Sequence, residues 1–181
     1  MAQWQIDPAH SEVKFKVKHL VVSTVTGHFR NFSATIEAEK GDFSDAQISF
    51  EADVNSISTN NEQREGHLKS PDFFDAEKFP KMAFRSKSVA RVSGDKYEVK
   101  GDLTIKGKTR PVTLDVTYNG TVAGFGGSKV AGFEITGKVN RFDYGLMWNA
   151  MTEAGGVVVS PDVKLDIAAE FNQVQQAVKA A

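Results

Sequence analysis

Histidines are the first residues in this sequence whose side chains could bind a metal ion or transfer a proton, and the chain contains 4 of them. His10, His19 and His28 are evenly spaced, at an interval that matches neither one face of a helix nor a common set of zinc ligands. We therefore predict no metal site. His19 differs from the others because it continues an alternation of apolar residues that includes Val17, which places its ring on the apolar face of a strand.

Carboxylates could supply acid–base chemistry, but most of them alternate with apolar residues and so fall on the outer faces of the expected strands. Asp72, Asp75 and Glu153 are exceptions, because they stand in long connections where they could face a substrate. A barrel enzyme of the cyclase or isomerase type, acting on a small apolar substrate through a residue such as Asp75, is therefore an alternative hypothesis.

Motifs for phosphate binding and nucleophilic catalysis do not support an enzyme. The segment 106–109, Lys-Gly-Lys-Thr, ends like the phosphate-binding loop GxxxxGK[ST], but Asp102 stands where that motif needs its first glycine. The chain has no cysteine, which excludes disulfides, thiolate nucleophiles and cysteine-bound zinc. We therefore expect no catalytic residue and no cofactor other than a bound ligand.

Charge and hydropathy exclude further classes of protein. The 181 residues include 22 basic and 23 acidic side chains, a balance that does not suit binding to nucleic acid through its phosphates. No run of about 18 apolar residues is present, so no transmembrane segment is predicted. The first residues lack the basic and apolar parts of a secretory leader. A cytoplasmic location is therefore expected, or a periplasmic one if a leader was removed.

The elements that must position these side chains follow from a hydrophobic period of two, which is typical of strands with one buried face. Eight segments alternate in this way: 13–17, 32–38, 48–54, 82–88, 97–105, 112–118, 133–139 and 163–171. Parallel strands covered on both faces would be apolar throughout, so these strands should be antiparallel. The sequence therefore predicts an all-β fold.

Short connections, such as Gly41–Asp45, favour the pairing of successive strands as hairpins. Eight such strands can close into an antiparallel up-and-down β-barrel, and a two-sheet sandwich is the alternative. One short helix is predicted in the connection between the third and fourth strands, where Asn60 and Gln63 form a capping box and Pro71 ends the helix. Nothing divides the chain, so residues 1–181 are predicted to form a single domain.

An eight-stranded barrel can be packed solid or can hold one small ligand. Small residues recur on the predicted inner faces: Ala34, Ala38, Ala52, Ser86, Ser88, Gly101, Gly137 and Ala169. If large neighbours such as Phe15 and Phe50 fill the space beside them, the interior is a plain core. We favour the other reading, an open tube lined mainly by apolar and aromatic side chains.

The long connections support an open tube. Residues 55–80 and 141–162 both carry several aromatic residues and should emerge at the same end of an up-and-down barrel, as lids or binding loops do. Basic residues are expected at this end: Arg64, Lys69, Lys106, Lys108, Arg110 and Arg141. An apolar tube with a basic rim suits an amphiphile that has a polar or anionic head.

Several runs, spread in order along nearly the whole chain, carry a resemblance to a known family. They include Trp4-x-Ile6-Asp7-Pro8-x-His10-Ser11, Gly27-x-Phe29, Phe73-Phe74-Asp75, Gly101-Asp102-Leu103-Thr104-Ile105 and Arg141-Phe142-Asp143-Tyr144-Gly145-Leu146. Together they resemble the YceI-like family, the polyisoprenoid-binding, lipocalin-like proteins of bacteria. The resemblance implies an antiparallel barrel that holds a long isoprenoid or a similar amphiphile in an elongated pore, often as a homodimer.

We therefore predict a non-enzymatic protein that binds a long-chain amphiphilic lipid, such as a polyisoprenoid or an isoprenoid quinone, for transport, storage or sequestration. A module that binds a protein partner through its aromatic loops is a third hypothesis. The predicted pore-lining residues are Val17, Phe50, Phe84, Leu103, Phe133 and Ile135, with Phe29 as a further ligand contact. The residues predicted to close the mouth are Leu68, Phe73, Phe74 and Trp148. The candidates for contact with the headgroup are His19, Arg64 and Arg141.

Overall fold

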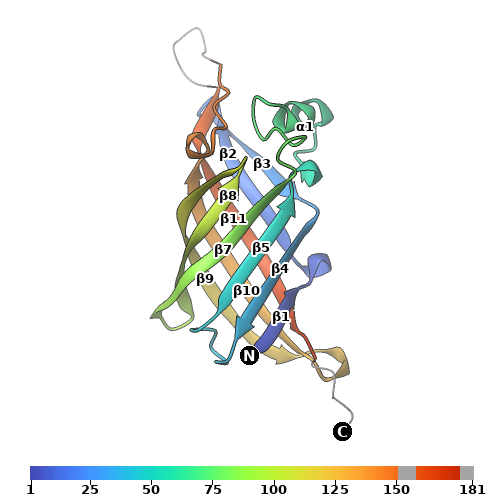
Figure 1. Cartoon of the computed structure of the whole chain (residues 1–181), viewed down its shortest axis with the longest axis vertical. Coiled ribbons are helices and arrows are strands. Elements are labelled where there is room, and N and C mark those ends of the chain that lie inside the picture. The colour runs from blue at the N-terminus through green and yellow to red at the C-terminus, as the bar shows by residue number, and fades with distance from the viewer. Residues whose placement is uncertain (151–157, 176–181) are drawn as a thin grey trace.

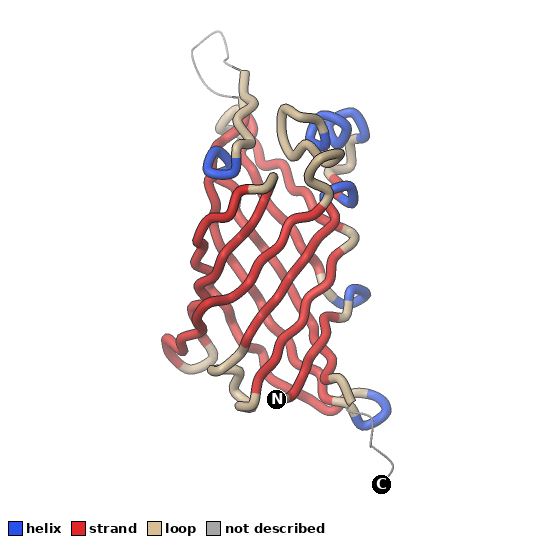
Figure 2. The backbone as a smooth tube through the Cα atoms, in the orientation of Figure 1, coloured by secondary structure: helices blue, strands red, loops and turns tan. Residues whose placement is uncertain are grey.

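The alternating segments form a closed antiparallel barrel in the computed structural model, which describes residues 1–150 and 158–175 (Figures 1 and 2). The strands are β1 (Ala2–Ile6), β2 (Glu12–His19), β3 (Ser23–Phe29), β4 (Phe32–Ala38), β5 (Gln47–Asp53), β6 (Ile57–Ser58), β7 (Lys81–Ser93), β8 (Lys96–Ile105), β9 (Lys108–Ala123), β10 (Lys129–Asn140) and β11 (Val159–Gln173). The helices are α1 (Glu62–Lys69) and four 3₁₀ helices, η1 (Pro8–His10), η2 (Val54–Ser56), η3 (Phe125–Gly127) and η4 (Arg141–Tyr144).

These strands occupy eight positions around the barrel. The long strand β11 pairs with β1 through Phe171 and Ile6, and with β2 through Ile167 and Val13. Strands β1 and β2 therefore share one position, interrupted by η1, while β3 and β4, which pair with β2 and β1, share the next. The predicted eight-stranded barrel is confirmed, and the sandwich alternative is wrong because pairing continues around the whole ring.

Strands β1 and β3 are absent from the sequence prediction, which begins the first strand at Val13. In β3 the apolar alternation is broken at Gly27, which has no side chain to contribute. The ring of Phe15 on β2 lies over this glycine, so that a Cβ atom at position 27 would stand 2.8 Å from Phe15 Cε1. The neighbouring strand therefore supplies the apolar group that the sequence of β3 lacks.

The helix lies within the predicted connection 55–80, but it follows the short strand β6 and begins one residue later than predicted. Its N-cap is Asn61, whose side-chain oxygen accepts a hydrogen bond from the Arg64 amide at 2.9 Å. The Glu65 carboxylate accepts in turn from the Asn61 amide at 2.9 Å. Asn60, the predicted cap, has a φ of 60° and forms the left-handed turn before the helix. No helix of the described residues is long and apolar enough to cross a membrane.

Candidate ligand-binding cavity

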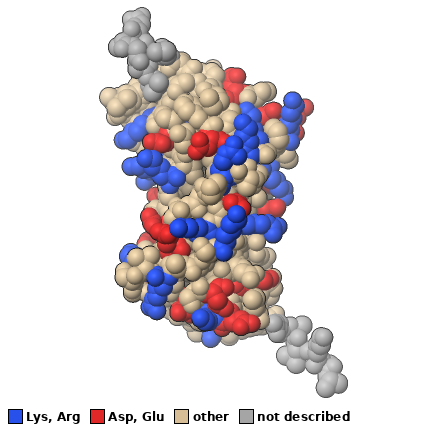
Figure 3. Space-filling view, turned by 60° about the vertical axis from the view of Figure 1, so that its left-hand side comes forward, with Lys and Arg blue, Asp and Glu red and all other residues tan. Residues whose placement is uncertain are grey.

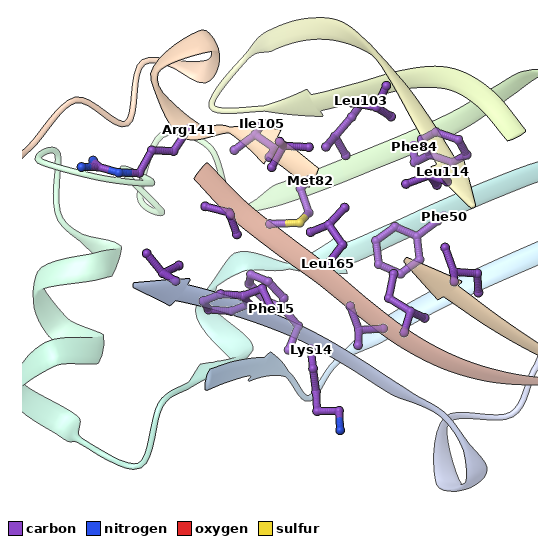
Figure 4. A pocket seen from close by; sticks show the side chains of 18 of the residues that line it. Lys14, Phe15, Phe50, Met82, Phe84, Leu103, Ile105, Leu114, Arg141 and Leu165 are labelled. Carbon is purple, nitrogen blue, oxygen red and sulfur yellow. The ribbon is translucent and has the colours of Figure 1, made fainter. Parts of the chain in front are cut away.

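An elongated cavity of about 740 Å³ lies inside the barrel. Figure 4 shows side chains from several strands, among them Phe50, Phe84, Leu103 and Leu165, pointing into this space. Small-molecule sites have volumes of about 300–1,000 Å³, so the cavity is large enough for a substantial ligand. The hollow reading of the sequence is therefore confirmed, and the plain core is wrong.

The wall of the cavity is apolar over most of its length. No aspartate or glutamate lines it within residues 1–150 and 158–175. Its polar groups gather at the end nearest α1, where Thr59, Asn61, Gln63 and His67 take part in the lining. Tyr97, by contrast, turns its hydroxyl to the Asp42 carbonyl oxygen at 2.6 Å and offers the cavity only its ring. The cavity thus has an apolar body and one polar end.

Aromatic side chains close the other end and form what we call the floor: Trp4, Phe43, Tyr118 and Phe133. The ring of Phe43 lies 5.1 Å from that of Trp4, and 5.2 Å from those of Tyr118 and Phe133, measured between centroids. Phe43 belongs to the turn between β4 and β5 and has a φ of 61°. The sequence analysis missed this residue because it stands outside the alternating segments, although a phenylalanine in an acidic turn was a usable signal.

Three segments meet above the polar end and form what we call the roof: α1, the connection 70–80 and the segment 145–150. His67 on α1 stacks edge-on against Phe73 at 5.0 Å and against Trp148 at 4.7 Å. Its Nε2 atom also lies 2.9 Å from the Asp72 carboxylate. Phe74 extends the cluster to Phe29 on β3, with 6.2 Å between ring centroids. His67 was not predicted, because helix α1 has no apolar stripe that marks an inner face.

Arg141 is buried behind the roof, and its guanidinium group donates to backbone carbonyl oxygens. Nη1 donates to Leu146 and Trp148 at 2.7 Å each, Nε to Ser160 at 3.0 Å and Nη2 to Val159 at 3.1 Å. Burial lowers the pKa of this group from its ordinary value. Most of its donors are therefore already used to hold residues 146–148 and 159–160 on the barrel.

The predicted basic rim is only partly present. Arg64 lines the mouth, with Nε donating to Thr59 Oγ1 at 3.0 Å, and His19 lines it at the upper end of β2. Lys69, Lys106, Lys108 and Arg110 do not line the cavity, which corrects the expectation that they form its rim. Lys106 shows why: its ammonium group donates to the carbonyl oxygens of Pro71 at 3.1 Å and Gly145 at 3.3 Å, and so joins two roof segments.

All fourteen residues predicted to bind ligand lie on the cavity wall. The alternation of the strands placed the pore residues correctly, and the aromatic connections placed the mouth residues. That each of them contacts a ligand stays a prediction. Two further residues near the polar end are Leu146 and Tyr144, and burial raises the pKa of Tyr144 to about 12. Its hydroxyl therefore stays protonated at neutral pH and can donate a hydrogen bond.

The carboxylates considered for catalysis lie elsewhere. Asp75 is buried but does not line the cavity, and Asp72 contacts His67 instead of facing inward. Glu153 lies outside the described residues. Asp7, His10 and Glu170 offer metal-ligating atoms within 4.8 Å of one another, but these residues lie away from the cavity, where His10 Nδ1 already lies 2.8 Å from Asp7 Oδ2.

Comparisons with known proteins agree with this architecture. A UPF0312 protein from Staphylococcus aureus (strain N315) is 42% identical over 173 residues, which cover 95% of this chain and 98% of that protein. Among solved structures, Burkholderia cenocepacia BcnA has 25% identity and a TM-score of 0.79, covering 91% of this chain and 98% of that one. The Campylobacter jejuni YCEI protein has 31% identity and a TM-score of 0.75, covering 88% and 91%.

A polyisoprenoid binding domain from Saccharophagus degradans shares the fold at 16% identity, with a TM-score of 0.69 over 94% of this chain and 98% of that one. The model of the YceI-like domain matches residues 4–171. That match runs from Trp4 in β1 to Phe171 in β11 and so includes part or all of every strand of the barrel. The chain therefore belongs to the YceI-like domain family.

Proposed function

We propose that this protein binds a long-chain amphiphilic lipid, such as a polyisoprenoid or an isoprenoid quinone, and that it transports, stores or sequesters that lipid. The observation that carries the proposal is the 740 Å³ apolar cavity, which has an aromatic floor at one end and polar groups at the other. The lipid tail fits the apolar body, and its head fits the end near Asn61, Gln63 and Arg64.

The energies favour a long tail as the source of affinity. Burying one CH₂ group contributes about 0.8 kcal/mol, so each five-carbon prenyl unit contributes roughly 4 kcal/mol before costs. A few units outweigh an association cost on the order of 4–15 kcal/mol. A single ion pair at the exposed Arg64 contributes about 0–1 kcal/mol. The tail therefore sets the affinity, and the head sets the orientation.

The proposal rests on the cavity of this chain and not on the ligand of a relative. The Saccharophagus degradans domain is described as binding polyisoprenoid, but its 16% identity supports a common fold only. The enzyme hypothesis is weaker, because the described lining contains no carboxylate and Asp75 lies outside it. A carrier needs no such group, whereas the enzyme hypothesis relied on a carboxylate such as Asp75 facing the substrate.

A cavity-filling substitution tests the proposal. Ala34 lies on β4, is buried and lines the cavity, so Ala34→Phe places a ring where the tail would lie. Ala90→Phe is the matched control, because Ala90 is exposed on β7 and is not part of the lining. We expect Ala34→Phe to weaken binding of geranylgeraniol at least about tenfold, and Ala90→Phe to leave it unchanged.

Binding is measured by native mass spectrometry of the full chain, with organic extraction of any lipid that co-purifies. Because Ala34→Phe fills empty space, its free energy of unfolding should stay within about 1 kcal/mol of that of the wild type. If the filled variant folds and still binds the prenyl alcohol as tightly as the wild type, the ligand does not occupy the cavity and the proposal is wrong.

A further inference from the structure

The turn between β2 and β3 presents three apolar side chains to water. Leu20, Val21 and Val22 are 40%, 74% and 85% exposed. Leu20 and Val21 also have φ values of 52° and 65°, in the left-handed region that hairpin turns normally give to asparagine or glycine. Neither solvent nor backbone geometry favours these residues here, so the requirements of folding do not explain their presence. We call these three residues the hairpin tip.

The hairpin tip stands at the mouth of the cavity. Lys18 and His19, which directly precede it, both line the cavity, and Figure 1 places this end of β2 and β3 at the same end of the barrel as α1. The Leu20 amide donates to the Val158 carbonyl oxygen at 2.9 Å, which ties the tip to the start of β11. A surface that the tip contacts would therefore lie next to the opening of the barrel.

The shape of the tip suits a lipid bilayer better than a second copy of the chain. A stable protein interface buries about 800 Å² on each partner, which three residues on a convex turn cannot provide. A bilayer needs no complementary shape, since apolar side chains enter the boundary between its headgroups and its acyl chains.

One basic side chain next to the tip, that of Lys18, can attract an anionic membrane. Lys14 pairs with Glu12 at 3.3 Å and Lys16 with Asp166 at 3.3 Å. Lys18, the lysine next to the tip, donates to Thr24 Oγ1 at 3.0 Å and forms no salt bridge within the described residues. Figure 3 shows one face of the molecule, on which uncharged atoms cover most of the upper end while Lys and Arg, mixed with acidic residues, gather below it.

We propose that the hairpin tip docks this protein on a membrane surface containing anionic lipid, with Leu20, Val21 and Val22 inserted among the headgroups and Lys18 at their level. Docking places the mouth of the barrel against the bilayer, where an apolar cargo can pass between the two without crossing water. The proposal goes beyond the proposed function, because docking requires no cargo and can be measured without one.

Site-specific fluorescence tests the docking. The chain has no cysteine, so Val22→Cys provides one labelling site for the environment-sensitive fluorophore NBD. Phe125→Cys is the matched control, because Phe125 is also fully exposed but lies in η3, at the end of the barrel opposite α1. With vesicles of phosphatidylcholine and phosphatidylglycerol at about 7:3, we expect a blue shift and an intensity gain of at least about threefold at position 22 only.

An unchanged spectrum at position 22, or an equal change at position 125, overturns the proposal. A change at position 22 that follows protein concentration in the absence of vesicles also overturns it, in favour of contact between two copies of the chain.

A second variant separates docking from cargo binding. Val21→Ser combined with Val22→Ser should reduce flotation with the same vesicles at least about fivefold, while Phe125→Ser floats like the wild type. The double variant should still bind geranylgeraniol added from solution. If that variant floats like the wild type, the tip does not dock. If the wild type does not bind geranylgeraniol but still floats with the vesicles, the proposed lipid-binding function is wrong and the docking proposal stands.

Discussion

Single residues in this barrel show that a charged group on the cavity wall can use most of its donors on the protein's own backbone. The sequence analysis assigned Arg141 to the headgroup from its position in an aromatic connection. In the structure its guanidinium group donates to the carbonyl oxygens of Leu146, Trp148, Val159 and Ser160, so it has a structural role whether or not it also contacts a headgroup. Backbone carbonyl groups occur at every residue, so no sequence pattern could have revealed these acceptors.

The first prediction concerns the cost of removing that group. Arg141→Ala should lower the free energy of unfolding by about 3 kcal/mol, because buried carbonyl oxygens left without a donor cost about 1–3 kcal/mol each and solvent reaches some of them. Urea denaturation measures the loss, and hydrogen exchange should show reduced protection of residues 146–150. Arg110→Ala is the control, because Arg110 is exposed and, among the residues that the structure describes, its guanidinium donates only to the adjacent Thr109 carbonyl oxygen. If Arg141→Ala is as stable as Arg110→Ala and only loses anionic lipids, the headgroup role is correct instead.

The second prediction concerns pH. A hydrogen bond to Asp7 raises the pKa of His10 above its ordinary 6.5, and the same bond lowers the pKa of Asp7 below 3.8. The histidine therefore adds stability below pH 6.5 that is lost as pH rises through its raised pKa. The aspartate adds stability above pH 3.8 that is lost as pH falls through its lowered pKa. Both contributions are present between these two values.

His10→Ala should therefore lower the melting temperature more at about pH 5.5 than at about pH 8.5. Because the imidazole is exposed, the difference should shrink in about 1 M salt, where charges are screened over a few ångströms. A loss that is equal at both pH values would mean that the charge of His10 contributes nothing and that its hydrogen bond to Asp7 acts through the neutral imidazole alone.

Whole elements were more predictable than single contacts. A strand with one buried face has alternating apolar and polar residues, because one side of it forms the wall of the cavity and the other faces water. Every strand predicted from this pattern is present. Strand β3 was not predicted, because its alternation is interrupted at Gly27. Phe15 of β2 covers this glycine, and the sequence of one strand does not show a contact with another. The N-cap of α1 is Asn61 instead of the predicted Asn60; the two side chains are identical, and only the backbone conformation, which the sequence does not show, distinguishes them.

The third prediction tests such a contact between elements. In β8, a Cβ atom at Gly101 would overlap the Arg85 carbonyl oxygen of β7 and approach Phe84 Cζ to 2.6 Å. The carbonyl belongs to paired backbone and cannot move away, so Gly101→Ala should destabilise the barrel by about 1–3 kcal/mol. Gly66→Ala, in exposed α1 with no atom near the new methyl group, should instead stabilise by about 0.5–1 kcal/mol. Thermal unfolding of both variants measures these changes in stability. A Gly101→Ala variant as stable as the wild type would mean that the close approach of the β7 backbone does not require glycine at this position.

At the scale of the whole molecule, the two ends of the barrel are closed by different kinds of segment, long connections at the roof and a short turn with strand residues at the floor. The up-and-down order predicts that the long aromatic connections share one end, and the roof confirms it. The floor was not predictable in the same way, because Phe43 reaches it from a turn and meets Trp4 and Phe133 from distant parts of the sequence. A closed floor and a polar mouth imply that a ligand enters and leaves at the α1 end.

The last prediction uses the two tryptophans as reporters of how far a ligand reaches. The chain has 2 tryptophans, and the structure places Trp148 in the roof and Trp4 in the floor. Trp4→Phe leaves emission from Trp148 alone, and Trp148→Phe leaves emission from Trp4 alone. If the head stays at the mouth, a short prenyl alcohol such as geraniol should shift only the Trp148 emission. A longer one that reaches Phe43 should also shift that of Trp4, because Phe43 packs directly on its ring.

The order of the two responses therefore separates the possible orientations of the ligand. Entry from the α1 end requires that Trp148 respond to chains of every length and Trp4 only beyond a threshold length. Phe43→Ala removes the ring through which the tail acts on Trp4, so this variant should raise the threshold length, because the tail must then cross the vacated space to reach Trp4. If geraniol shifts the Trp4 emission and not that of Trp148, the short ligand lies at the floor. Apolar burial there would then contribute more binding free energy than the contacts of the head with the polar mouth.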